Sequence, residues 1–132
     1  MQVSSGYNQY KEQSVSTMTQ GEMLIFLYEE SIKSLTKAKY LCYNKDYEGF
    51  EKEVGRAKDI ISYLDQTLDK KYPISADLHK LYDFIIFQLS RAIASRKTEI
   101  IDEVIPFLKE LLDTWKEADR INTKKPNTQM QG

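Results

Sequence analysis

The sequence predicts an all-α protein, an antiparallel up-and-down four-helix bundle with an extended N-terminal arm. Apolar residues recur at three- and four-residue steps along four segments of the chain, and connections of only a few residues separate these segments. No segment shows the alternation of apolar and polar residues that is typical of strands. Because short connections make each helix return alongside the preceding one, the four segments predict an up-and-down bundle.

The size and composition indicate a single domain. A chain of 132 residues is long enough to bury a substantial apolar core. Its single cysteine, Cys42, excludes an internal disulfide framework. No apolar run approaches the roughly 20 residues that span a bilayer, and the N-terminus lacks the apolar region of a signal peptide. We therefore expect a cytoplasmic protein without membrane insertion.

The first helix is predicted to begin at Gln20 and to end near Tyr43. Thr19 and Glu22 have the spacing of a capping box, in which the Thr hydroxyl accepts from a backbone N–H three residues on and the Glu carboxylate accepts from the N–H of the cap. The residues that share the predicted core face of this helix are Leu24, Leu27, Tyr28, Ser31, Ile32, Leu35, Ala38 and Cys42.

The predicted arm precedes this cap. Tyr7, Tyr10 and Val15 form a sparse apolar set on a segment that has no helical period. Such a segment must lie on another surface, so we expect residues 1–18 to form an arm against the bundle. The bundle domain, with its arm, is expected to cover residues 1–121, and residues 122–132 lack an apolar pattern and are expected to form a disordered tail.

Asp46 is predicted to cap the second helix, and Pro73 is predicted to end it because proline lacks an N–H donor and disfavours a helical backbone at the preceding residue. The seam of this helix has the spacing of a helix packed nearly parallel to its neighbours, with Phe50, Val54, Ala57, Ile61, Leu64 and Leu68. The third helix is predicted to open at Ser75 and to stop near Arg96. Its core face is formed by Leu78, Leu81, Tyr82, Ile85, Leu89, Ala92 and Ile93.

Thr98 is predicted to cap the fourth helix, whose pattern fades after Ile121. Its apolar face is formed by Ile101, Val104, Ile105, Leu108, Leu111, Leu112 and Trp115. Pro106 lies inside this helix and removes the hydrogen bond that the Asp102 carbonyl would accept, so a kink or a split is expected there. Two interpretations are open: strain that is tolerated at a solvent-facing turn, or a bend that shapes a groove.

Several aromatic residues fall outside or at the edge of the predicted core faces. They are Phe26, Tyr40, Tyr63, Phe84, Phe87 and Phe107. A small bundle has no second core to hold them, and contiguous exposed aromatic residues usually mark a partner surface. Three interpretations are open: a groove for a partner helix or extended segment, padding that the arm covers, and the interface of a homodimer.

The sequence gives no indication of an enzyme, a cofactor or a nucleic-acid partner. His79 is the only histidine, and the residue three positions before it is Ala76 rather than the Glu of a metal-binding bundle. The five glycines form no phosphate-binding loop. Nineteen basic and 20 acidic residues give a net charge of −1, so no basic patch for a phosphate backbone is expected. We predict no catalytic residue, no metal site and no cofactor.

One pattern of residues covers almost the whole predicted bundle. It begins with Tyr7-x-x-Tyr10-x-x-x-x-Val15-x-Thr17-x-Thr19-x-x-Glu22 and continues with Arg56-Ala57-Lys58, with Leu81-Tyr82-Asp83-Phe84, and with the segment from Val104 to Trp115. In order and spacing this pattern resembles the FliS family, the flagellin-specific export chaperones of bacterial flagella. The resemblance covers about residues 7–119. The chain departs from the family pattern at Gln20, where the family usually has Pro, and at Glu29-Glu30, where it has Asp-Gly.

The resemblance implies a cytoplasmic chaperone that binds the disordered C-terminal segment of flagellin, prevents its premature polymerisation and delivers it to a component of the flagellar export gate. It also implies a protein that is a monomer or a weak dimer when free and needs no nucleotide. With the surplus aromatic residues, the resemblance implies the following client-binding positions: Tyr7, Tyr10, Val15, Phe26, Leu81, Tyr82, Phe84 and Phe87. The alternative is a self-associating helical adaptor without a flagellin client.

Overall fold

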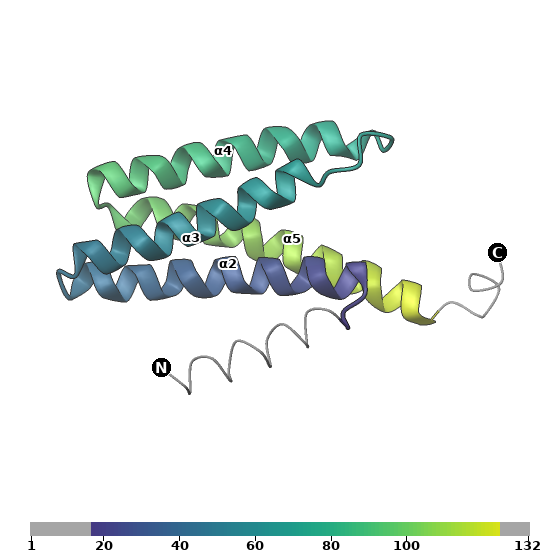
Figure 1. The fold of residues 1–132 in the computed structure, drawn as a ribbon, viewed down its shortest axis with the longest axis horizontal. Helices are drawn as coiled ribbons and strands as arrows, with labels where there is room; N and C mark the ends of the chain where they lie inside the picture. The colour runs from purple at the N-terminus through teal and green to yellow at the C-terminus, as the bar shows by residue number, and fades with distance from the viewer. Residues whose placement is uncertain (1–16, 125–132) are drawn as a thin grey trace.

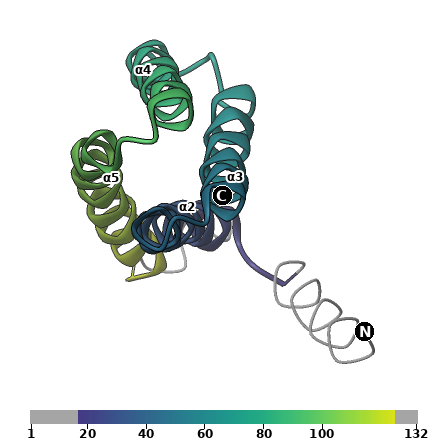
Figure 2. The same cartoon turned by 90° about the vertical axis from the view of Figure 1, so that its left-hand side faces the viewer.

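The computed structural model describes residues 17–124, and this part of the chain forms four helices and no strand. The helices are α2 (Gln20–Tyr43), α3 (Tyr47–Gln66), α4 (Ile74–Ser95) and α5 (Thr98–Lys124). Figure 1 shows them lying side by side along the long axis, and Figure 2 shows them arranged as a ring. In this ring α2 packs against α3 and α5, and α4 packs against the same two helices. The all-α, up-and-down bundle is confirmed.

The N-terminal arm lies almost entirely outside the described residues. Its last residues, 17 and 18, lead without helical structure to the cap Thr19. Three of the predicted client-binding positions, Tyr7, Tyr10 and Val15, fall in the part that the structure does not describe. Their role therefore stays a prediction.

Two of the three predicted helix caps, at Thr19 and Asp46, are confirmed, whereas Thr98 is the first residue of α5 and not its cap. The Glu22 N–H donates to Thr19 Oγ1 at 3.1 Å, and the Thr19 N–H donates to Glu22 Oε1 at 2.9 Å, which completes the capping box of α2. At the start of α3, the Gly49 N–H donates to Asp46 Oδ1 at 3.0 Å. Each cap satisfies backbone donors that the helix itself leaves free, and such a cap stabilises a protein by about 1 kcal/mol.

The core forms along the predicted faces of all four helices. Its fully buried side chains include Tyr28, Leu35, Phe50, Ile61, Tyr82, Ile85, Leu89, Ile101 and Leu108. Leu81 and Trp115 are only partly buried and pack at the edge of this core. The four helices thus share one apolar interior, which holds them in fixed positions relative to one another.

The predicted end of the second helix is wrong. Helix α3 ends at Gln66, where the Thr67 hydroxyl donates to the Leu64 carbonyl at 3.1 Å and the Leu68 N–H donates to the Asp65 carbonyl at 3.3 Å instead of to Leu64. Pro73 instead directly precedes α4, with a φ of −57° that suits the start of a helix. Proline therefore marks the beginning of the next helix here and not the end of the previous one.

Helix α5 begins at Thr98 itself and continues through Pro106 to Lys124. It therefore includes the first residues of the predicted tail, and the expected split at Pro106 is not found. Pro106 is exposed, so water can satisfy the Asp102 carbonyl that loses its intrahelical donor. This arrangement agrees with strain tolerated at a solvent-facing turn.

A candidate partner-binding surface on α4 and α5

Three phenylalanines from α4 and α5 form an exposed aromatic surface. Phe84, Phe87 and Phe107 are 46%, 62% and 43% exposed. The rings of Phe84 and Phe107 meet edge to face, with their centroids 6.2 Å apart and their planes at 77°. Phe87 follows Phe84 by one turn of α4 and so extends along the same side of the helix. We call these three residues the aromatic surface.

The phenylalanines of α4 stay exposed because other residues already occupy the face of α4 that packs against the core. Leu78, Tyr82, Ile85 and Leu89 occupy the core face of this helix. Phe84 points away from this face, and its only ring contact in the described part of the chain is with Phe107. Large aromatic rings left outside a complete core are typical of a surface that another polypeptide covers.

Tyr82, a predicted client-binding residue, belongs to the core instead. Its side chain is 1% exposed, and its hydroxyl lies 2.5 Å from the hydroxyl of Tyr28. Burial raises the pKa of Tyr82 well above its usual value, and Tyr28 raises it further. Burial likewise raises the pKa of Tyr28, so both phenols stay neutral. The pair joins α2 to α4 across the interior and thereby positions the helix that carries Phe84.

The remaining predicted residues lie in two different places. Leu81 is partly buried and packs against the core on α4. Phe26 is partly buried on α2. Ion pairs of Glu29 with Lys116 and of Lys39 with Asp102 show the antiparallel register of α2 and α5. This register puts Phe26 near the C-terminal part of α5, away from Phe107. The aromatic surface therefore contains Phe84 and Phe87 of the predicted set, but not Phe26.

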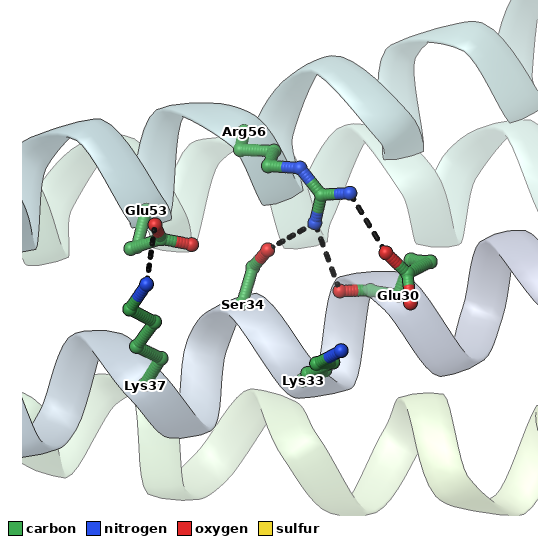
Figure 3. A pocket seen from close by; sticks show the side chains of 6 residues that line it. All are labelled: Glu30, Lys33, Ser34, Lys37, Glu53 and Arg56. Atoms are coloured by element: carbon green, nitrogen blue, oxygen red, sulfur yellow. Dashed lines mark hydrogen bonds and ion pairs between the residues drawn. The ribbon is translucent and has the colours of Figure 1, made fainter. Parts of the chain in front are cut away.

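Charged residues join α2 to α3 on another side of the bundle. Figure 3 shows Arg56 of α3 reaching across to α2, where it donates to Glu30 Oε1 at 2.8 Å and to Ser34 Oγ at 2.5 Å. Lys37 pairs with Glu53 at 3.7 Å in the same pocket of about 230 Å³. Glu30 stands at one of the positions where the chain departs from the family pattern. Since it pairs with Arg56, we assign this pocket to the joining of the two helices.

A more apolar groove lies between the start of α2 and the end of α3. Its lining includes Met18, Met23, Leu24, Leu27 and Tyr63, and it encloses about 580 Å³. Tyr63 is 53% exposed. We call this the apolar groove. Met18 is the second described residue, so the chain preceding α2 reaches the groove directly after the described region begins at Thr17.

The structure also brings together three polar residues that the sequence analysis did not connect. His79 of α4 is hydrogen-bonded through Nδ1 to Asp65 Oδ1 of α3 at 2.6 Å, and its Nε2 lies 3.4 Å from Asp83 Oδ2. The hydrogen bond to Asp65 and the charges of both carboxylates raise the pKa of His79. The four-residue spacing of His79 and Asp83 was a visible signal, but Asp65 is far from them in the sequence.

No helix in residues 17–124 is long and apolar enough to cross a membrane. Residues 17–124 thus form a small helical bundle that exposes the aromatic surface of Phe84, Phe87 and Phe107. The sequence of the chain matches the family model for the flagellar protein FliS over residues 3–122, and the chain belongs to this family.

Comparisons with individual proteins agree with this assignment. The flagellar secretion chaperone FliS of Bacillus subtilis (strain 168) is 30% identical over 118 residues, which cover 89% of each chain. The flagellar secretion chaperone FliS of Campylobacter jejuni (serotype O:6) is 30% identical over 125 residues, covering 93% of this chain and 98% of its own. A crystal structure of a bacterial flagellar chaperone has the same fold, with a TM-score of 0.73 at 21% identity, covering 88% of this chain and 96% of its own.

Proposed function

We propose that this chain is an export chaperone that binds the C-terminal segment of flagellin in the bacterial cytoplasm, keeps it from polymerising and delivers it to the flagellar export gate. Membership of the FliS family supports the class of function, because two relatives are named flagellar secretion chaperones. The observation that carries the proposal in this molecule is the aromatic surface of Phe84, Phe87 and Phe107.

The binding of a disordered segment needs a large apolar surface. Ordering such a segment costs about 2–5 kcal/mol, which burial of roughly 1,000–3,000 Å² offsets. The aromatic surface supplies rigid anchors, because a phenylalanine ring loses little conformational freedom when it is covered. Helix α4 is itself held by the buried Tyr28–Tyr82 pair, so these anchors are preorganised.

In this proposal the client segment folds into helical and extended pieces that lie on the aromatic surface. While bound, the segment is unavailable for contacts with other flagellin molecules, which prevents early assembly. The N-terminal arm, with Tyr7, Tyr10 and Val15, covers apolar surface in the free protein and moves when the client binds. The apolar groove is a candidate position for this cover, because Met18 lines it and directly follows residues 1–17.

Titration calorimetry with a peptide of the flagellin C-terminal segment, together with circular dichroism of the mixture, tests the proposal. We expect one-to-one binding, a negative heat-capacity change from apolar burial, and a gain of helicity as the peptide folds. Absence of binding, with a molecular mass that rises with protein concentration in light scattering, would instead support the self-associating adaptor.

A further inference from the structure

A compact group of metal-ligating side chains lies where α3 ends and α4 begins, apart from the aromatic surface. Asp65 comes from the last turn of α3, and His79 and Asp83 come from the first half of α4. One ring nitrogen of His79 and one carboxylate oxygen from each aspartate lie within 4.8 Å of one another. Two helices therefore contribute to one cluster of potential ligands.

The backbone holds these ligands in place. His79 and Asp83 are four residues apart on one helix, so their side chains share a face, as do the two histidines of helix-borne zinc motifs. The Asp65 side chain is only 19% exposed, and packing at the end of α3 restricts it. The side chains of His79 and Asp83 are 55% and 64% exposed, which leaves a path for an ion from solvent.

The donor set determines which ion would fit. An imidazole nitrogen with two carboxylate oxygens suits first-row transition metals, whereas Mg²⁺ and Ca²⁺ prefer oxygen ligands alone. Bonds of about 2.0–2.2 Å to Zn²⁺ place neighbouring ligand atoms roughly 3–4 Å apart. The ligand atoms of Asp65, His79 and Asp83 lie within 4.8 Å of one another, so the side chains must draw closer, around one ring nitrogen of His79, to hold an ion.

We propose that Asp65, His79 and Asp83 form a binding site for one first-row transition-metal ion, of which Zn²⁺ fits best, and that the ion fastens α4 to α3. Water would complete the coordination. This proposal replaces the prediction of no metal site, which rested on the absence of Glu three residues before His79 and did not consider Asp65. An ion at this site would stabilise the folded protein by mass action and fix the part of α4 that precedes Phe84.

The single histidine makes the test specific, because the imidazole proton resonances of the full chain report on one residue. We expect ZnCl₂ to shift these resonances until one equivalent is added, and MgCl₂ to leave them unchanged. The same titration of Cys42→Ser should behave identically, since the only thiol of the chain is not a ligand. Unmoved resonances at one equivalent of Zn²⁺, or equal shifts with Mg²⁺, would overturn the proposal.

Calorimetry with substituted chains identifies the ligands. We expect His79→Ala and Asp83→Asn each to weaken Zn²⁺ binding at least about tenfold, because loss of even an outer-shell partner of a metal ligand costs about 10- to 100-fold in affinity. Asp77→Asn is the matched control, because it removes an exposed carboxylate from the same helix outside the cluster. Wild-type affinity in His79→Ala, or an equal loss in Asp77→Asn, would contradict the assignment. Circular dichroism of each variant verifies that it is folded.

Discussion

At the level of single residues, substitutions of Phe84 and Phe87 should affect client binding without affecting folding. Because both rings are exposed and lie outside the core, Phe84→Asp combined with Phe87→Asp should leave the helicity intact. The affinity for the flagellin peptide should fall about 30-fold or more, which corresponds to the loss of one hot-spot side chain of about 2 kcal/mol. Calorimetry and circular dichroism measure the two effects.

The control for these substitutions is Tyr40→Asp. Tyr40 is 64% exposed but lies on α2, outside the aromatic surface. The Tyr40→Asp variant should bind the flagellin peptide with the affinity of the wild type. Loss of helicity in the double variant would assign the two rings to the core, and an equal loss of affinity in Tyr40→Asp would mean that the aromatic surface is not the specific site.

Tyr28 and Tyr82 have the opposite role, and their hydroxyls should matter for stability alone. Tyr82→Phe leaves the Tyr28 hydroxyl buried without its partner, which should lower the free energy of unfolding by about 1–3 kcal/mol. Adding Tyr28→Phe removes the unpaired group, so the double variant should lose less than the sum of the two single losses. Urea unfolding of all four proteins measures this coupling. Strictly additive losses, or a double variant that is fully stable yet does not bind the peptide, would contradict a structural role.

The sequence alone could not separate the roles of Leu81, Tyr82 and Phe84. Helical periodicity placed Leu81 and Tyr82 on the same core face, and it correctly placed Phe84 outside it. It could not reveal that Tyr82 meets the hydroxyl of Tyr28, because this contact joins helices that are distant in the sequence. The pairing of Phe84 with Phe107 was missed for the same reason.

At the level of helices, two glycines of α3 should respond oppositely to alanine. A Cβ on Gly55 would meet no atom within 4 Å, so Gly55→Ala should raise the free energy of unfolding by up to about 1 kcal/mol, through lower backbone entropy of the unfolded chain. A Cβ on Gly49 would lie 2.6 Å from Asp46 Oδ2, the carboxylate that caps α3. Gly49→Ala should therefore leave the free energy of unfolding unchanged or lower it. Thermal unfolding of both variants tests the contrast, and equal stabilisation would show that the cap adjusts freely.

The starts of α2 and α3 were predictable and the end of α3 was not, because the interactions that specify them act over different distances in the sequence. The caps of Thr19 with Glu22 and of Asp46 depend on residues within one turn, so the local sequence specifies them. The end of α3 involves Thr67, whose hydroxyl donates to the Leu64 carbonyl that the Leu68 N–H would use in a longer helix. Pro73 sets only an outer limit for that end. The exposure of Pro106, which lets α5 continue, depends on packing that the sequence does not state.

At the level of the whole molecule, short connections were enough to predict the bundle, but not what its neighbouring helices bring together. The ring in which α4 packs against α3 and α5 creates both the aromatic surface and the cluster of Asp65, His79 and Asp83. Each combines residues from two helices. The apolar pattern within a single helix predicted that Phe84 and Phe87 lie outside the core. It could not predict that Asp65 of another helix contacts His79.

The proposed movement of the arm is a property of the whole chain, and amide hydrogen exchange tests it. If the arm covers apolar surface in the free protein, the amides of residues 7–16 should exchange more slowly than in an unfolded chain, and addition of the flagellin peptide should change their rates. The amides at the centre of α3 serve as an internal control, because the core holds them in both states. Free-chain rates for residues 7–16 without the peptide would exclude the cover. The peptide would then bind through Phe84, Phe87 and Phe107 without displacing the arm.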